Sequence, residues 1–164
     1  PELKFIADAM LGKLAKWLKI LGFDTLYFSK IEDESFLKLA AQERRIILTR
    51  DTGLIEKSGQ VKHLFITSEN WYEQIQQVLA AFDLWDKVKP NSRCLECNVE
   101  MKTLSRKSAK NLVAPFIYEH ARSFAICPQC GRVYWQGTHY QEMEAKIKQI
   151  LDKKNKRETS KRKG

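Results

Sequence analysis

The segment Arg45-Ile-Ile-Leu-Thr49 is the clearest strand in the sequence, and the interpretation of the fold starts from it. It is rich in β-branched residues and nearly continuously apolar, which is typical of a strand buried on both faces of a parallel sheet. Arg50 and Asp51 follow directly, and Thr52-Gly53 then breaks the extended conformation. We therefore expect a buried sheet that presents charged residues where this strand ends.

Three further segments have the composition of strands of the same sheet, and amphipathic segments alternate with them. We expect these strands at Leu3–Ala7, Thr25–Phe28 and His63–Thr67. Apolar residues recur at helical spacing in the segments between and after them, so we expect helices at residues 9–21, from Asp33 and from about Glu69. The order β-α-β-α-β-β-α predicts an α/β fold, with a parallel sheet covered by helices on both faces.

All four cysteines lie in two pairs, Cys94-Leu-Glu-Cys97 and Cys127-Pro-Gln-Cys130. Two residues between thiols let both sulfurs of a pair reach one tetrahedral ion, and two such pairs complete a closed Cys₄ zinc site. A closed site of this kind is structural, because it leaves no coordination position for a substrate. Two disulfides are the alternative, but no secretory signal is evident and the composition is typical of the cytoplasm, where we expect the protein.

The second cysteine pair lies between two short apolar segments. Ser123–Ile126 and Arg132–Trp135 are expected to form a β-hairpin with the cysteine pair as its turn. Residues 102–111 between the pairs are expected to be a basic polar loop, and a last helix is expected at His139–Lys153. These elements form a module of their own after the α/β part of the chain.

The positive charge is distributed unevenly along the chain. Residues 1–88, the expected α/β domain, carry twelve Lys or Arg against thirteen Asp or Glu. The expected zinc ribbon with its helix, residues 89–152, has a net charge of +4, and residues 153–164 have +6 and are expected to form a disordered basic tail. This asymmetry favours a polyanionic partner such as nucleic acid, although a purely solubilising tail remains open. No apolar run is long enough to span a bilayer.

Three aspartates occupy related places in the expected topology. Asp8 and Asp51 come just after strands, and Asp33 opens the helix that follows another strand. Open α/β sheets place their functional crevice outside these strand ends, and converging carboxylates there require a cation. Hard oxygen ligands select Mg²⁺ or Mn²⁺, ions that support phosphodiester cleavage. Each aspartate could instead be a helix cap or turn residue, but capping does not require three acids at one end of one sheet.

Cationic residues near these acids are candidates for phosphate contacts. Lys13 and Lys16 lie one turn apart on the helix after Asp8, and Arg50 precedes Asp51. The alternative is that the two lysines form the solvated face of an amphipathic helix and that Arg50 is an exposed charge at a strand end. Asp24 is expected at the opposite end of the sheet, as a turn residue.

The run Phe5-Ile-Ala-Asp8-Ala-Met-Leu-Gly-Lys-Leu-Ala-Lys-Trp-Leu-Lys-Ile-Leu-Gly-Phe-Asp24 closely resembles the start of the Mut-seven-C RNase family. Further matches are Asp33-Glu34 at a helix start, the segment Arg45–Asp51, both CxxC pairs and Val133–His139. Together they cover nearly the whole chain except the tail. The family joins a PIN-like nuclease domain to a C-terminal zinc ribbon, so the resemblance implies a PIN-like parallel sheet followed by that ribbon.

By this resemblance, Asp8, Asp33 and Asp51 match the metal-binding acids of PIN-type nucleases, which cleave RNA using Mg²⁺ or Mn²⁺. The chain departs from the family's pattern in two places. Lys13 and Lys16 stand where arginine is usual, which weakens bidentate binding of phosphate. Gly53 stands where a fourth acid is common, which puts a second catalytic ion in doubt.

The expected function is therefore that of a metal-dependent ribonuclease acting on single-stranded RNA, with a zinc ribbon that assists RNA binding. One alternative is a catalytically inactive adaptor that binds RNA or associates with the ribosome. A phosphatase acting on a small substrate is a further alternative, but the sequence has no glycine-rich phosphate loop and no evident nucleophile–base pair. A toxin-type role rests on fold analogy alone.

Overall fold

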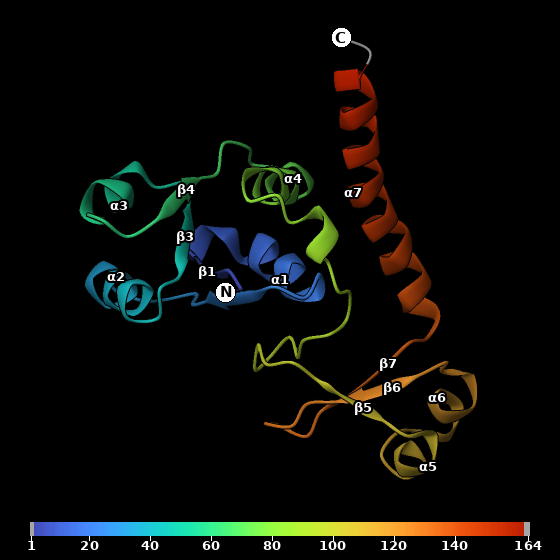
Figure 1. Cartoon of the computed structure of the whole chain (residues 1–164). Coiled ribbons are helices and arrows are strands. Elements are labelled where there is room, and N and C mark those ends of the chain that lie inside the picture. The colour runs from blue at the N-terminus through green and yellow to red at the C-terminus, as the bar shows by residue number, and fades with distance from the viewer. Residues whose placement is uncertain (1, 163–164) are drawn as a thin grey trace. The chain divides into compact units, whose positions relative to one another are not determined.

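The computed structural model describes residues 2–162, and within its last helix the side chains of residues 138, 139 and 153–162 are left undescribed. The chain divides into two compact units, Pro1–Asn91 and Ser92–Gly164 (Figure 1). The first unit contains a parallel sheet with flanking helices, and the second contains a small antiparallel sheet and the four cysteines.

The sheet of the first unit has four strands in the order β2-β1-β3-β4, and every neighbouring pair is parallel. The strands are β1 (Lys4–Ala7), β2 (Asp24–Tyr27), β3 (Ile46–Thr49) and β4 (His63–Phe65). Strand β3 lies between two neighbours, and all four of its residues are buried. The expected α/β fold with a parallel sheet is confirmed, and the apolar residues Ile46, Ile47 and Leu48 of β3 suit this central place.

Helices cover both faces of this sheet (Figure 1). Helices α2 (Asp33–Gln42) and α3 (Thr52–Lys57) pack Phe36, Ala40 and Leu54 into a cluster with Ile6 of β1 and Ile47 of β3. Because side chains alternate along a strand, Phe5 of β1 points to the opposite face. There its ring contacts that of Phe82 (centroids 5.7 Å apart), which caps the C-terminus of α4 (Trp71–Ala81).

Helix α1 and two 3₁₀ turns complete the first unit. A 3₁₀ turn, η1 (Ala9–Leu11), leads from β1 into α1 (Gly12–Ile20), and a second, η2 (Trp85–Lys87), follows α4. Trp17 of α1 stacks on Trp71 of α4 with ring centroids 4.9 Å apart.

Helix α3 was not expected from the sequence: Thr52 and Gly53 begin a short helix because Asp51 caps it.

The second unit contains the sheet β5-β6-β7, in which both pairs are antiparallel. Strands β6 (Phe124–Ile126) and β7 (Val133–Trp135) confirm the hairpin predicted around the second cysteine pair. The loop predicted for residues 102–111 is wrong, because β5 (Lys102–Leu104) and α5 (Arg106–Ala109) lie there. Helix α6 (Pro115–His120) follows, and Ala109 packs with Ala121 and Phe124 in a small apolar cluster.

Two boundaries differ from the sequence-based expectation. The units divide after Asn91 rather than after residue 88, because the N–H groups of Lys89 and Asn91 donate to carbonyls of Leu21 and Ile20 (both 2.8 Å) in the first unit. Helix α7 (Thr138–Arg162) continues through residues 153–162, where disorder was expected. Its sequence contains neither proline nor glycine and is rich in good helix formers. Residues 163–164 of the expected tail lie outside the described range.

Among the residues that the structure describes, no helix is both long and apolar enough to cross a bilayer.

Candidate active site and cysteine cluster

The strand order creates a switch point between β1 and β3. The chain passes from β1 to β2 on one side and then returns to β3 on the other side of β1. Asp8 follows the last residue of β1, and Asp51 lies two residues beyond the end of β3. Crevices of open α/β sheets form at such a point, outside the carboxyl ends of the strands. Two of the three predicted acids therefore flank the expected place for a site.

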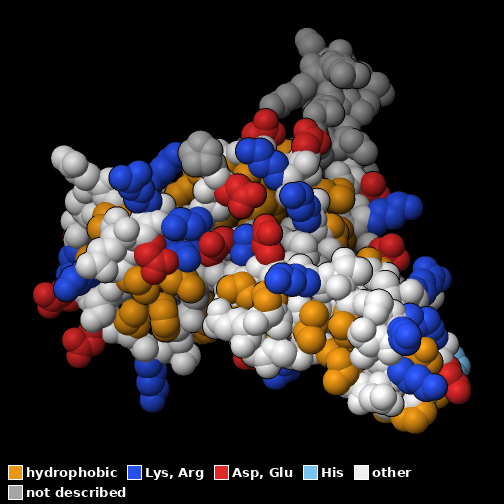
Figure 2. All heavy atoms as spheres, turned by 60° about the horizontal axis from the view of Figure 1, so that its bottom comes forward, with side chains coloured by type: hydrophobic (Ala, Val, Ile, Leu, Met, Phe, Trp, Pro, Cys, Tyr) orange, Lys and Arg blue, Asp and Glu red, His pale blue; other side chains and the backbone are white. Residues whose placement is uncertain are grey.

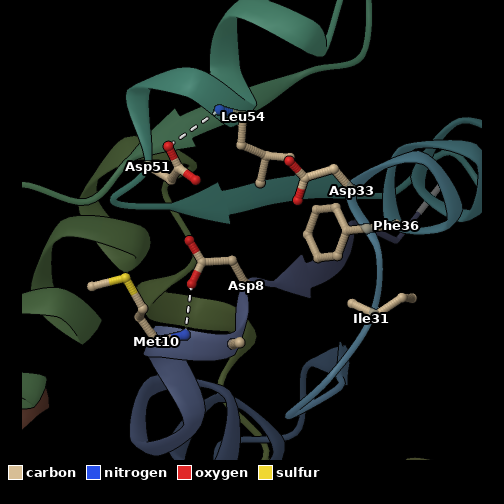
Figure 3. Close-up of a pocket in the computed structure, with 8 residues that line it drawn as sticks. Asp8, Met10, Ile31, Asp33, Phe36, Asp51 and Leu54 are labelled. Carbon is tan, nitrogen blue, oxygen red and sulfur yellow. Dashed lines mark hydrogen bonds between the residues drawn. The ribbon is translucent and has the colours of Figure 1, made fainter.

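A pocket of about 140 Å³ lies there, and all three predicted acids line it (Figure 3). The carboxylates of Asp8, Asp33 and Asp51 surround the same space in the close-up. The complete lining consists of Asp8, Ala9, Met10, Ile31, Asp33, Phe36, Asp51 and Leu54. The three predicted acids thus line one shared pocket, and its apolar lining comes from Ala9, Met10, Ile31, Phe36 and Leu54.

Asp8 is the most deeply placed of the three acids, with 8% of its surface exposed. Its Oδ1 accepts a hydrogen bond from the N–H of Met10 (2.7 Å), which caps the 3₁₀ turn η1. Its Oδ2 accepts from the hydroxyl of Thr49 and, at 3.4 Å, from the N–H of Arg50. These donors fix the orientation of the carboxylate toward the pocket.

Asp51 and Asp33 are more exposed than Asp8. Asp51 is the N-cap of α3, and its Oδ1 accepts from the N–H groups of Gly53 (2.9 Å) and Leu54 (3.4 Å). Asp33 is the first residue of α2 rather than its cap, and its Oδ2 lies 3.3 Å from Nζ of Lys57. The capping interpretation therefore holds for Asp8 and Asp51 alongside their place in the pocket, and it does not hold for Asp33.

The three acids do not by themselves form a closed cation cage. Among the described residues, the four cysteines are the group whose metal-ligand atoms all lie close enough to share one ion, and the three aspartates are not such a group. Asp33 is instead neutralised by Lys57. Lys57 was missed in the sequence analysis, because it lies on the unexpected helix α3 and carries no motif.

The three predicted phosphate-binding residues do not line the pocket. Lys13 is exposed, and its Nζ lies 5.0 Å from the centroid of the Trp71 ring. Lys16 is exposed on the same helix. Arg50 is directed toward the end of β4, where its guanidinium donates to the carbonyl of Ile66 (2.9 Å). Met10, which precedes helix α1 and has 72% of its surface exposed, does line the pocket.

The four cysteine sulfurs of the second unit lie within 4.8 Å of one another. The Sγ atoms of Cys94 and Cys130 are 3.8 Å apart. With zinc–sulfur bonds of about 2.3 Å, two ligands of a tetrahedral ion are separated by about 3.8 Å. The four thiols are free rather than paired in disulfides. The arrangement therefore fits a tetrahedral metal ion.

The two cysteine pairs have the same backbone conformation. The N–H of Asn98 donates to the carbonyl of Cys94 (2.8 Å), and the N–H of Gly131 donates to that of Cys127 (3.0 Å). Both residues have positive φ, 62° for Asn98 and 77° for Gly131, which suits glycine and asparagine. Backbone N–H groups also point at sulfur, as from Cys97 to Cys94 and from Cys130 to Cys127 (both 3.4 Å). Such donors stabilise thiolate ligands.

The thiols of the cluster also influence one another's ionisation. Burial acts to raise the pKa of Cys94, but hydrogen bonds from Tyr134 and from the N–H groups of Cys97 and Glu96 outweigh it and lower this pKa to about 6. Desolvation and bonds to neighbouring thiols raise the pKa of Cys97 to about 12. Four thiolates this close would require a cation, and the donor set fits a zinc or other thiophilic ion.

Tyr134 connects the hairpin to the first cysteine pair. Its hydroxyl donates to Sγ of Cys94 (3.2 Å) and accepts from the N–H of Leu95 (3.0 Å). Desolvation and the bond to Cys94 raise the pKa of Tyr134 to about 12, so it remains a hydrogen-bond donor at neutral pH. No sequence signal distinguished this tyrosine from its neighbour Trp135.

The fold and the two sites define an α/β protein with an acidic pocket at the switch point of its sheet and a separate Cys₄ module. Residues 3–147 match the family model of the Mut7-C RNAse domain, so the chain belongs to this family. This confirms the resemblance drawn from the sequence. No curated protein and no solved structure gave a match to the chain.

Proposed function

We propose that the protein is a metal-dependent ribonuclease that hydrolyses RNA phosphodiester bonds at the pocket formed by Asp8, Asp33 and Asp51. The observation that carries this proposal is the placement of the three carboxylates around one pocket at the switch point of the sheet. Membership of the RNase family supports an RNA substrate. We take that substrate to be single-stranded RNA in the cytoplasm, as expected from the sequence.

The three aspartates have different roles in this proposal. Asp8 and Asp51 are held rigidly by hydrogen bonds from Met10, Thr49 and Gly53. Asp33 would hold the cation in place of its partner Lys57, which would leave the lysine ammonium available to a substrate phosphate. A bound Mg²⁺ or Mn²⁺ supplies charge stabilisation and activation of water.

The remaining predicted site residues bind substrate or support the second unit. Lys13 and Lys16 lie exposed on α1, whose preceding turn contains the pocket residue Met10, and they contact RNA phosphates. Arg50 supports the site mainly through its N–H bond to Asp8, because its guanidinium is engaged by Ile66. Cys94, Cys97, Cys127 and Cys130 hold a structural Zn²⁺, and the ribbon assists RNA binding.

The proposal is tested by cleavage of a fluorescently labelled single-stranded RNA by the purified full chain, with and without Mn²⁺ or Mg²⁺. We expect cleavage that requires the divalent ion and falls at least a hundredfold in Asp8→Asn and in Asp51→Asn. Asp83→Asn makes the same chemical change at an exposed residue of the same unit, where φ is 49° and asparagine is well tolerated. Equal cleavage by the natural chain and all three variants would refute the assignment of the pocket as the active site.

A second candidate function is favoured by a specific observation. The acids line a pocket but are not grouped closely enough to share one ion, and Gly53 stands where the family commonly has a fourth acid. Both features suit a catalytically inactive RNA-binding or ribosome-associated adaptor. This candidate predicts RNA binding without divalent-dependent cleavage, so the same experiment separates the two functions.

A further inference from the structure

A two-helix insertion separates the two cysteine pairs. Helices α5 and α6 lie between strands β5 and β6, and their exposed side chains are of two kinds, cationic and apolar or aromatic. We call this the insert surface and define it by Lys107, Lys110, Leu112, Phe116 and His120, all of which are exposed. Figure 2 shows Lys and Arg side chains beside exposed hydrophobic ones over this part of the molecule.

The insert surface has unbalanced positive charge. Residues 105–122 contain four Lys or Arg and one Glu. Lys107 and Lys110 are three residues apart along α5 and its cap, so they lie on the same side of that turn. Both are exposed, and neither ammonium group has a hydrogen bond or ion pair with another described residue. Their ammonium groups are therefore available to a partner.

Arg106, by contrast, holds the insertion together. Its guanidinium lies over the Tyr118 ring, 4.6 Å from the centroid, and over the Phe124 ring. It also donates to the carbonyls of Ala121 (3.0 Å) and Tyr118. These contacts fix α5 against the end of α6, so the lysines are presented on a supported turn rather than on a free loop.

Phe116 is the most exposed aromatic side chain among the described residues, at 69%. Its ring stacks on that of His120, with centroids 4.2 Å apart and planes 26° from parallel. The His120 Nδ1 is hydrogen-bonded to the carbonyl oxygen of Phe116 (2.8 Å), which holds the imidazole in place. A hydrophobic ring that is supported from one side and open to solvent elsewhere is a ready stacking partner.

We propose that the insert surface binds single-stranded RNA, with Phe116 stacking on a base and Lys107 and Lys110 contacting phosphates. Every base offers a π-face and every nucleotide a negative charge, so a supported aromatic ring beside unpaired cations matches this partner. A protein partner would be better served by a wider apolar patch with fewer ammonium groups. The inference rests on the proposed function only in taking RNA as the substrate.

The test measures binding of a labelled single-stranded RNA to the full, zinc-loaded chain over a range of salt concentrations, without added Mg²⁺ or Mn²⁺. Phe116→Ala is expected to weaken binding about tenfold, because it removes the ring on which a base stacks, and to leave the salt slope unchanged. Phe116→Tyr keeps the ring and is expected to bind within about twofold of the natural chain.

The lysines are tested through the salt dependence. Lys107→Gln combined with Lys110→Gln is expected to reduce the slope of log K against log salt by about 1.4, at about 0.7 for each single-strand phosphate contact. Lys38→Gln combined with Lys87→Gln removes the same charge from exposed positions of the first unit and serves as the matched control. Zinc content and circular dichroism verify that each variant is folded.

The proposal is overturned if Phe116→Ala binds RNA as tightly as Phe116→Tyr, or if the two double lysine variants have the same slope. Either result would indicate that the insert surface binds a protein partner instead of RNA. Failure of the ribonuclease proposal is distinguishable, because it would show as missing cleavage in the natural chain while the binding differences persist.

Discussion

The hydroxyl of Thr49 donates a hydrogen bond to the carboxylate of Asp8 across the two central strands of the sheet. The same oxygen accepts a hydrogen bond from the N–H of Asp51 at 2.9 Å. Thr49 is fully buried, so a single side chain at the end of β3 connects two acids that lie 43 residues apart in the chain.

The first prediction concerns this connection. Thr49→Val keeps the side-chain shape but leaves Asp8 and the Asp51 N–H without their shared partner. We expect the free energy of unfolding to fall by roughly 1–3 kcal/mol, the usual cost of an unsatisfied buried polar group. Cleavage should fall as well at temperatures where the variant is folded. Urea denaturation measures the first effect, and Thr49→Ser, which keeps the hydroxyl, should retain cleavage.

Removing Lys57 should strengthen binding of the divalent ion. The ammonium group of Lys57 lies 3.3 Å from Asp33 and would compete with a divalent cation for this carboxylate. Both side chains are more than half exposed, so the pair contributes only about 0.2–1 kcal/mol. We therefore expect Lys57→Gln to tighten Mn²⁺ binding by up to about fivefold in calorimetric titration. Lys62→Gln is the control, and weaker binding in Lys57→Gln would argue against Asp33 as a ligand.

The hydroxyl of Tyr134 should contribute to metal affinity in the second unit. Tyr134→Phe removes the donor to Cys94 and the acceptor for Leu95 while keeping the ring. Loss of such a supporting group typically costs 10–100-fold in metal affinity, and we expect a value near the lower end. Competition with a chromophoric chelator measures it. Tyr118→Phe, in the same unit, is the control, and equal zinc affinity in both variants would contradict the role of Tyr134.

The basic C-terminal segment should strengthen RNA binding. Residues 153–164 carry seven Lys or Arg against one acid. If these cations contact a single strand, deletion of the segment should reduce the slope of log K against log salt by as much as roughly 5, at about 0.7 per contact. Fluorescence anisotropy of labelled RNA at several salt concentrations measures the slope. Unchanged affinity and slope would leave the segment a solubilising role only.

Arg45 should matter for stability and not for cleavage. It is buried, with 6% of its surface exposed, and it donates to Asp24 (2.7 Å), Glu43 (2.9 Å) and the carbonyl of Phe5 (3.0 Å). Asp24 and Glu43 retain some access to water, so we expect Arg45→Met to cost about 2–3 kcal/mol of unfolding free energy, slightly below the range for a fully buried pair.

The cleavage rate of folded Arg45→Met should be unchanged, because Arg45 lies at the end of the sheet opposite the pocket. Exposed Arg44→Met is the stability control. A loss of cleavage in the folded variant would mean that the two ends of the sheet are coupled. The finding also corrects the interpretation of Asp24, which is an ion-pair partner at the first position of β2 rather than a turn residue.

The amino-acid sequence by itself determined the features that depend on local pattern. The apolar runs predicted all four strands of the first sheet, and the spacing of Cys94, Cys97, Cys127 and Cys130 predicted one cluster of thiols. Apolar runs and CxxC spacing can be recognised in the sequence because burial and ligation act on neighbouring residues. The position of Asp8 and Asp51 just after strands predicted that they share a crevice.

Only the tertiary structure decided what depends on residues distant in the chain. The order β2-β1-β3-β4 brings Asp8 and Asp51 to adjacent strands, and the pairing of Lys57 with Asp33 follows from the unexpected helix α3. Likewise, the sequence does not distinguish Arg45 and Thr49, at the two ends of a buried strand, from ordinary residues. Their hydrogen bonds to Asp24 and Asp8 depend on how the strands are arranged. Hydrogen bonds and ion pairs of this kind are set by strand order and register, which no local run of residues specifies.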